Sequence, residues 1–302
     1  MIDYNQEPKI IHDFGEKKIA SFISDDNSGN SDSKTVNSFG DEWNKFSNFD
    51  KEELTKISNE YFDLLNEDIV NSNSEVLDLG GGTGRWSKCL ANKVGFIEMI
   101  DPSSAIFSAK NLLEDEKNVR ITQAGAENIP FADESFNFAM SLGVLHHIPD
   151  TEKALRKMVE KVKIDGHVLL YLYYKLDNRG LAYKFLFFLS NVFRRIISAM
   201  PKFLKHFFCD LIAIFVYLPY IGLAKFVKFL FKGSFYKKFP LSYYIGKSFY
   251  IIRNDALDRF GTPLEKRFSK KEIETMMINS GLSDIVFSSN PPYWHCVGRR
   301  IS

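Results

Sequence analysis

The stretch VLDLGGGTGR, residues 76–85, decides the fold. An apolar, strand-forming run passes directly into the alternating glycines Gly80, Gly82 and Gly84, and a helical pattern begins near Arg85. Glycine lets the backbone turn sharply and approach a ligand more closely than a side chain would permit. The amides of the following helix start point into the same crevice. The stretch therefore predicts a strand, a ligand-binding loop and a helix.

The rest of the chain alternates between strand and helix patterns. Buried strand patterns recur in five segments, which are residues 75–80, 95–103, 119–125, 135–145 and 167–174. Helical patterns follow at 85–94, 104–116 and 150–162, and a capped helix at 269–281 precedes an antiparallel strand pair at 283–289 and 293–300. Strands that alternate with helices indicate parallel crossover units. We expect a doubly wound, seven-stranded, mostly parallel α/β sheet with an α-helical lid insertion.

Composition divides the chain into four parts. Residues 1–37 form an acidic N-terminal arm that we expect to be partly disordered, and residues 38–175 form the ligand-binding core with a covering helix at its start. Residues 176–254 form a basic, aromatic, helical insert, and residues 255–302 return to the core. The predicted sheet thus begins before the insert and is completed after it.

Charge is distributed unevenly, although the formal net charge is only +1. Residues 1–75 hold seven Lys and no Arg against 17 Asp plus Glu, a balance of −10. Residues 176–254 hold 13 Lys plus Arg against two Asp, a balance of +11. This asymmetry indicates either an anionic partner or docking of one segment on the other.

The three cysteines, Cys89, Cys209 and Cys296, have neither the paired spacing of a metal site nor that of a disulfide framework. We expect no metal and a reducing compartment. The N-terminus lacks the basic and apolar regions of a secretory signal, so we expect a cytoplasmic protein.

Two carboxylates narrow the choice of ligand. Arg85 stands where a nicotinamide-binding fingerprint requires glycine, and Asp78 precedes the loop where such a site has an apolar residue. A carboxylate there suits an ammonium or sulfonium group better than a pyrophosphate. Asp101, at the end of the second strand, is placed to accept hydrogen bonds from both hydroxyls of a ribose. The alternative for Asp101 is a helix cap ahead of Pro102.

These blocks together resemble the class I S-adenosylmethionine-dependent methyltransferases. The matching stretches are VLDLGGGTGRWS, EMIDPS, AGAENIPFADESFNFAMSLGVLHHIPD and VKIDGHVLLYLYY, in family order over about residues 75–175. The resemblance implies a Rossmann-like fold, S-adenosylmethionine as methyl donor and S-adenosylhomocysteine as product.

The resemblance also implies roles at the methionine and ribose end of the cofactor. Asp78 would act near the methionine amino group, directly or through water. Gly80, Gly82 and Gly84 would lie beneath the methionine and ribose, and Asp101 would hold the ribose diol.

At the adenine end, Pro102 and Ser103 would flank the base, and Ala126 and Glu127 would reach its edge. Gly125 stands where the family usually has an acidic residue. That departure affects the expected adenine contacts only slightly.

Ser141 and Leu142 would line the floor beside the transferable methyl group. FGDEW, residues 39–43, resembles the start of the family's covering helix. Trp43 and Phe46 would then close over the cofactor, or would pack the helix onto the sheet.

No catalytic base stands out. His146 and His147 in LHHIPD are candidates, but packing or backbone hydrogen bonding explains them better. His206, in the basic insert, is a third candidate for which a helix face is the simpler explanation. His295 has the position of a structural residue on a closing strand.

The insert contains CDLIAIFVYLPYIGLAKFVKFLFK, residues 209–232, which resembles a membrane span. Its charge-free part, residues 211–224, has only 14 residues, whereas a span needs about 20. A sheet completed on both sides of the insert also permits only zero or two crossings, and residues 185–193 are too short for a second. We therefore expect no span. A helix lying on a membrane is one interpretation, but an insert after the fifth strand emerges at the carboxyl edge of the sheet, so we expect a substrate-covering lid that can also touch the membrane.

The sequence thus predicts methyl transfer to a small-molecule acceptor, such as a phosphate-bearing sugar or natural-product intermediate. One alternative is a lipid or lipid-linked acceptor at the membrane surface, with peripheral membrane contact through residues 176–254. Another is a non-catalytic, cofactor-binding, membrane-docking protein. A nicotinamide oxidoreductase conflicts with the loop. A nucleic-acid partner is disfavoured because the cations are mixed with dense aliphatic runs, and NPPYW, residues 290–294, is interpreted as a turn.

Overall fold

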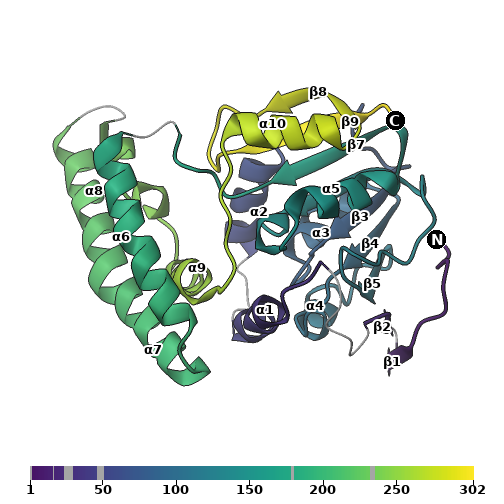
Figure 1. Cartoon of the computed structure of the whole chain (residues 1–302), viewed down its shortest axis with the longest axis horizontal. Helices are drawn as coiled ribbons and strands as arrows, with labels where there is room; N and C mark the ends of the chain where they lie inside the picture. The colour runs from purple at the N-terminus through teal and green to yellow at the C-terminus, as the bar shows by residue number, and fades with distance from the viewer. Residues whose placement is uncertain (1, 16, 24–29, 46–50, 178–179, 232–234) are drawn as a thin grey trace. The chain divides into compact units, whose positions relative to one another are not determined.

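In the computed structural model (Figure 1) the chain divides into two compact units. Unit 1 comprises residues 1–177 and 264–302, and unit 2 comprises residues 178–263. The structure describes the ranges 2–15, 17–23, 30–45, 51–177, 180–231 and 235–302. Phe46, predicted to close over the cofactor, lies outside these ranges.

Unit 1 is built on one mixed sheet of nine strands in the order β1-β2-β5-β4-β3-β6-β7-β9-β8. The strands are β1 (Ile10–Phe14), β2 (Lys17–Ser21), β3 (Glu75–Leu79), β4 (Phe96–Ile100), β5 (Val119–Gln123), β6 (Phe136–Leu142), β7 (Val162–Tyr171), β8 (Leu282–Phe287) and β9 (His295–Arg300). Strands β2 to β7 pair in parallel across the middle of the sheet, and β8 and β9 close it antiparallel. The doubly wound, mostly parallel prediction is confirmed.

The prediction of seven strands was wrong by two, because the N-terminal arm joins the sheet. β1 and β2 form an antiparallel hairpin, and β2 pairs in parallel with the edge strand β5. The Arg120 guanidinium lies 4.3 Å from the centre of the Tyr4 ring, whose hydroxyl lies 2.7 Å from Thr122 Oγ1. The arm expected to be partly disordered is thus ordered over residues 2–15 and 17–23. The strands of the arm were not predicted from the sequence, because β1 is mostly exposed and lacks the alternation of apolar and polar residues.

Two apolar layers cover the two faces of the sheet. On one face, α5 (Thr151–Glu160) and α10 (Lys270–Asn279) pack on the odd-numbered residues of β3, such as Leu77. On the other face, α2 (Lys51–Tyr61), α3 (Arg85–Leu90) and α4 (Ile106–Leu112) pack against its even-numbered apolar residue, Val76. This alternation follows from the two-residue period of a strand. The predicted capped helix is α10, where Ser269 and Glu272 form a capping box.

Helix α1 (Ser33–Lys45) lies at the carboxyl edge of the sheet. Asp32 caps it by accepting a hydrogen bond from the Thr35 amide. Gly40 packs so closely on the loop after β4 that an added Cβ would lie 2.5 Å from Ser104 Oγ. Phe39 makes an edge contact with His147, with ring centres 4.7 Å apart. The helix therefore contacts the loops after two central strands.

Unit 2 consists of helices α6 (Leu181–Ser198), α7 (Lys202–Ile212), α8 (Leu218–Leu230) and α9 (Phe249–Gly261), with 3-10 turns η4 (Phe235–Lys238) and η5 (Ser242–Tyr244). A π-helical turn, η3 (Ala213–Tyr217), joins α7 to α8. α9 belongs to this unit, beyond the expected boundary at residue 254, because it packs against α6 and α7.

Residues 202–230 form one continuous helical run, the only stretch of the described residues that is long and apolar enough to cross a membrane by length and composition. Only its charge-free part, 14 residues long, was compared above with the length of a membrane span. Pro219 does not end the run, because it occupies the first turn of α8 and follows the wider π turn, where a missing N–H is tolerated.

Candidate cofactor site

The glycine loop after β3 has the left-handed backbone that its sequence requires. Gly80, Gly82 and Gly84 have φ values of +82°, +57° and +81°. At Gly80 a side chain is also excluded by space, because an added Cβ would lie 2.4 Å from Val144 Cγ1, in the loop after β6. The loop therefore packs against the loop after β6 at the carboxyl ends of the strands, the edge at which doubly wound sheets have their ligand crevice.

Asp101 connects the glycine loop to the end of β4. The amide of Gly82 donates to Asp101 Oδ2 at 3.0 Å. The Ser103 amide and hydroxyl donate to Oδ1 at 2.8 and 2.6 Å. Burial raises the pKa of Asp101, while these three donors favour its charged form. The structure thus places the Asp101 carboxylate, predicted to bind the ribose, beside the glycine loop. Ser103, predicted to flank the adenine, instead donates hydrogen bonds to that carboxylate.

Asp78 is fully buried one residue before the end of β3. Ser87 Oγ, from α3, donates to Asp78 Oδ2 at 2.6 Å. Burial raises the pKa of Asp78 to about 7, and the nearby Asp101 charge adds to the shift. A carboxyl whose charged form is opposed by burial favours a cationic partner, so Asp78 suits the ammonium or sulfonium group predicted from the sequence.

Some buried polar atoms at this edge of the sheet have no hydrogen-bond partner among the described residues, and two of them bear on ligand binding. They are Thr83 Oγ1, in the glycine loop, and His146 Nε2, after β6. Buried polar atoms are nearly always paired, so unpaired ones indicate a ligand or water. Together with the buried carboxyls of Asp78 and Asp101, they are the donor and acceptor set that a polar, cationic cofactor would require.

The predicted adenine contacts lie after β5. Ala126 is buried, and Glu127 is exposed. The Glu127 carboxyl folds back over Gly125, where an added Cβ would lie 2.4 Å from its Oε1. An acidic group thus lies beside position 125, although it comes from a side chain two residues later. Gln123 Nε2 donates to the carbonyl of Pro102 at 3.3 Å and ties this loop to the Asp101 loop.

Ser141 and Leu142, the predicted floor beside the methyl group, are the last two residues of β6 and are both buried. The Ser141 hydroxyl donates to the carbonyl of Leu79 at 2.9 Å. The hydroxyl thereby fixes the end of β3, while Leu142 contributes the apolar surface at the neighbouring strand end.

His146 and His147 both bind backbone. The Tyr173 amide donates to His146 Nδ1 at 3.4 Å, and His147 Nδ1 donates to the carbonyl of Leu264 at 2.6 Å. Burial lowers the pKa of His146 well below its ordinary value, and nearby His147 and Arg267 add to that effect. The ring is therefore neutral, with its proton on Nε2.

The remaining candidates are His206, His295 and Trp43. His206 is half-buried in α7 of unit 2. His295 is buried on β9, where Nε2 lies 2.6 Å from the Asp63 carboxylate and Nδ1 lies 2.7 Å from the carbonyl of Pro292, a structural arrangement. Trp43 lies within α1, but its side chain is outside the described residues.

Sequence reasoning missed Tyr173 and Arg267. The Tyr173 ring stacks on His146 with centres 3.9 Å apart, and the Arg267 guanidinium lies 5.1 Å from the centre of the same ring. Glu265 pairs with Arg267 at 2.8 Å. The aromatic cluster YLYY at the end of β7 was a signal for Tyr173. Nothing local marks Arg267, because it comes from a segment some 90 residues later in the chain.

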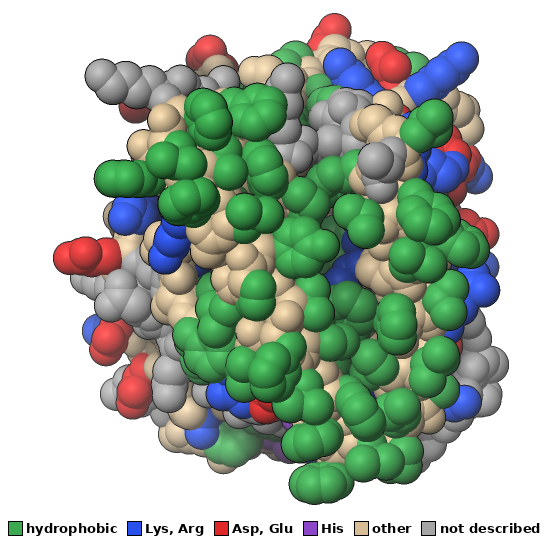
Figure 2. All heavy atoms as spheres, turned by 90° about the vertical axis from the view of Figure 1, so that its left-hand side faces the viewer, with side chains coloured by type: hydrophobic (Ala, Val, Ile, Leu, Met, Phe, Trp, Pro, Cys, Tyr) green, Lys and Arg blue, Asp and Glu red, His purple; other side chains and the backbone are tan. Residues whose placement is uncertain are grey.

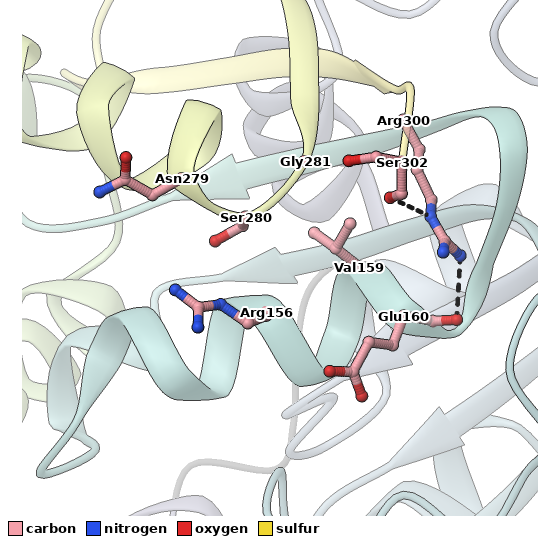
Figure 3. A pocket seen from close by; sticks show the side chains of 8 residues that line it. All are labelled: Arg156, Val159, Glu160, Asn279, Ser280, Gly281, Arg300 and Ser302. Carbon is pink, nitrogen blue, oxygen red and sulfur yellow. Dashed lines mark hydrogen bonds between the residues drawn. The ribbon is translucent and has the colours of Figure 1, made fainter.

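A hollow of about 270 Å³ lies at the opposite, amino edge of the sheet (Figure 3). It is bounded by the end of α5, the end of α10 and the C-terminus, and Arg300 within it already binds the carbonyls of Glu160 and Ser302. It does not overlap the crevice. Among the described residues no group of three or more potential metal ligands occurs.

The geometry is that of a doubly wound, Rossmann-like domain with a ligand crevice at the carboxyl ends of its strands. Residues 77–170 match the family model described as "Methyltransferase domain". The core of this chain is a class I S-adenosylmethionine-dependent methyltransferase domain, as the sequence predicted.

Three curated relatives are similar over this core. An uncharacterized methyltransferase of Staphylococcus carnosus is 29% identical over 41% of this chain and 58% of its own length. The uncharacterized methyltransferase YcgJ of Bacillus subtilis is 32% identical over 33% of this chain and 40% of its own. A ubiquinone/menaquinone biosynthesis C-methyltransferase of Idiomarina loihiensis is 33% identical over 33% of this chain and 43% of its own.

The chain thus spans about half the length, or less, of these relatives. The solved structure of the Bacillus subtilis YcgJ protein superposes on 84% of this chain and 100% of its own, with a TM-score of 0.48 and 14% identity.

Proposed function

We propose that this protein transfers the methyl group of S-adenosylmethionine to a small-molecule acceptor that bears a phosphate. The observation that carries the proposal is the hydrogen bond from Gly82 to the buried Asp101 carboxylate. It joins the ends of two neighbouring strands into one crevice, in which Asp78 and Thr83 present further polar atoms.

The residues divide the binding of the cofactor between them. Asp101 would hold the ribose, Asp78 the cationic end of the methionine, and Leu142 the apolar floor near the methyl group. Bound S-adenosylmethionine supplies a methyl group activated by its sulfonium. The acceptor's lone pair forms the new bond to the methyl carbon, the sulfur keeps the electrons of the broken bond, and the acceptor's proton leaves to solvent. The protein's main contribution is to position the acceptor and exclude water.

His146 is not assigned as the base for that proton. Its Nδ1 accepts from the Tyr173 amide, so its Nε2 carries a proton and is a donor. A neutral donor at the crevice would instead orient the acceptor by a hydrogen bond.

The class of acceptor follows from charge. Unit 2 carries 14 Lys plus Arg against three Asp, a balance of +11. Lys and Arg form strong, charge-assisted hydrogen bonds with phosphate. This surplus supports a phosphate-bearing acceptor, such as a nucleotide-linked sugar or a natural-product intermediate. The alternative is a lipid-linked phosphate at a membrane surface, and a third possibility is a protein that binds the cofactor without transferring its methyl group.

A transfer assay with a labelled methyl group distinguishes these three proposed functions. The purified protein and methyl-labelled S-adenosylmethionine are incubated with nucleotide-linked sugars, with a lipid extract and with a whole-cell extract, and the label is followed into each fraction. Label in phosphorylated small molecules is the expected result, and label in the organic fraction would favour the lipid-linked alternative. Cofactor binding without transfer to any fraction would contradict an enzymatic function.

A further inference from the structure

Unit 2 exposes an unusual amount of apolar surface. It holds 25 of the 32 exposed large hydrophobic side chains among the described residues, although it comprises only 86 of the 302 residues. Phe229 is 85% exposed, Phe203 79% and Phe215 71%. Figure 2 shows the face made by these helices, which hydrophobic side chains cover broadly, with Lys and Arg mainly near its margins. Apolar patches of this extent mark interaction sites.

The polar contacts of unit 2 are concentrated on its other side, toward α9. Arg253 of α9 forms a two-bond pair with Asp210 of α7, at 3.0 and 2.7 Å. The Tyr217 hydroxyl donates to Asp255 at 2.7 Å, and Arg259 donates to the Ser190 hydroxyl at 3.0 Å. A water-soluble helix pair normally buries its apolar face and exposes its polar face. Here the polar groups of α6 and α7 are used internally, and the outward surface is apolar.

Exposed charges on the long helical run are confined to its first residue and its last two turns. Between residues 203 and 224, every exposed side chain of the long helical run is apolar or a tyrosine, and Lys202 and Lys225 stand at the two limits. On α6 the exposed apolar stretch, 185–193, is likewise limited by Lys184 and by Arg195. Lys side chains at such borders can reach the headgroup level while their stems lie along apolar surface.

We propose that this apolar face of unit 2 docks in the plane of a lipid bilayer that carries anionic headgroups. An anionic bilayer complements the balance of +11, with each basic residue near the surface adding to the attraction. A second copy of this chain would present the same +11 and would be repelled. The proposal is independent of methyl transfer, because it rests on unit 2 alone.

The orientation in the plane follows from lengths and topology. β7 precedes unit 2 and β9 follows it, and the two strands pair in one sheet, so a single crossing is impossible. Two crossings would require α6 as well, whose apolar stretch of nine residues measures about 14 Å against a hydrocarbon core of about 30 Å. The helices therefore lie along the surface, with their apolar face among the upper acyl chains.

Flotation with vesicles tests docking. The wild-type chain is expected to float with phosphatidylcholine vesicles that contain phosphatidylglycerol, and far less with phosphatidylcholine alone. The double substitution Phe215→Ser with Phe229→Ser should lower binding about tenfold or more, since two exposed aromatic anchors are lost. The matched control is Ile10→Ser with Ile11→Ser, two exposed apolar residues of β1 in unit 1, which should leave binding unchanged.

Tryptophan probes test the orientation. A tryptophan reporter is placed at each end and in the middle of the long run by the single substitutions Phe203→Trp, Phe215→Trp and Phe229→Trp. The three native tryptophans, all in unit 1, give the same background emission in each variant. Lipids brominated at shallow positions should quench all three reporters equally. Deep quenching of the Phe215 probe alone would mean a crossing and overturn the in-plane proposal.

Two further results would overturn docking itself. The first is wild-type protein that stays with the aqueous phase in the presence of anionic vesicles. The second is a dimer, seen by sedimentation without lipid, that Phe215→Ser with Phe229→Ser dissociates, which would assign the face to a second copy.

Discussion

Asp78 and Asp101 are two buried carboxyls that share a crevice, and their surroundings give them different properties. Three donors, from Gly82 and Ser103, support the charge on Asp101. Ser87 donates to Asp78 through both its hydroxyl and its amide, yet burial raises the pKa of Asp78 to about 7. A cationic cofactor would therefore stabilise the charged form of Asp78 and lower the pKa of its carboxyl.

We predict that binding of S-adenosylmethionine weakens as the pH falls below 7. With a pKa of about 7, only about a tenth of Asp78 is ionised at pH 6, so affinity should fall about tenfold between pH 8 and pH 6. Because the free, folded protein holds this proton more tightly than the unfolded chain does, Asp78 also costs stability as the pH rises from about 4 to about 7. Cofactor binding should release the proton.

Calorimetric titration in buffers of different ionisation enthalpy measures both effects. Asp78→Asn keeps an acceptor for Ser87 but has no charge, so its affinity should be lower and independent of pH. An affinity that does not change with pH in the wild-type chain, with no proton released, would refute this role for Asp78.

The positions of both carboxyls could be predicted from the sequence, because parallel strands bring their carboxyl ends to one edge. Their partners could not. The donors to Asp101 and the unpaired Thr83 hydroxyl depend on the loop conformation, and Glu127 reaches Gly125 only because a loop folds back on itself. Such contacts leave no periodic pattern in the sequence from which they could be predicted.

At the scale of elements, the glycine loop is the part of the fold least tolerant of change. Gly80 combines a φ of +82° with the contact of an added Cβ on Val144. Gly15, in the turn between β1 and β2, has a φ of +81°, but nothing within 4 Å of an added Cβ. A side chain at Gly15 would thus suffer backbone strain alone, whereas a side chain at Gly80 would suffer both backbone strain and a steric overlap.

We predict that Gly80→Ala costs more stability than Gly15→Ala. The left-handed backbone should cost about 1–2 kcal/mol at either position. The overlap with Val144 should add about 1–3 kcal/mol at Gly80 only, and cofactor affinity should fall with it. Urea denaturation of the two variants measures the difference, and equal losses would show that the loop relaxes around a side chain.

Elements differed in how far the sequence predicted them. The box of Ser269 and Glu272 predicted α10 because capping is a local interaction. The hairpin of β1 and β2 was not predicted, because its strands gain their stability from β5, about 100 residues later in the chain. The long run through η3 was underestimated, because a π turn leaves no mark in the hydrophobic pattern.

At the scale of the whole molecule, the chain divides into a unit that carries the cofactor crevice and a unit that carries the apolar face. All the cofactor-binding candidates lie in unit 1. The two ends of unit 1 that flank the insertion are held together within it, since the Lys175 amide donates to the Phe268 carbonyl at 2.9 Å and the Phe268 amide to the Tyr173 carbonyl at 2.9 Å. From charge and composition we expected an insert at residues 176–254 that could touch a membrane, but the sequence did not indicate which helix surfaces of unit 2 would be exposed.

We predict that unit 1 folds and binds S-adenosylmethionine without unit 2. Replacing residues 178–263 by a short Gly-Ser linker should keep the sheet intact, because the flanking segments are already paired. Circular dichroism and calorimetry check folding and affinity, and flotation should show that vesicle binding is lost. A folded but non-binding deletion would mean that unit 2 completes the cofactor site.

The central claim is that the carboxyl ends of β3 and β4, beside the glycine loop, bind S-adenosylmethionine through Asp101. Calorimetric titration of the wild-type chain and Asp101→Ala tests it most directly. We predict that the wild-type chain binds S-adenosylmethionine and not NADH. Asp101→Ala should bind about 1–3 kcal/mol more weakly, since a charged acceptor is lost. Equal affinities for the cofactor in both chains, or heat with NADH instead, would contradict the account.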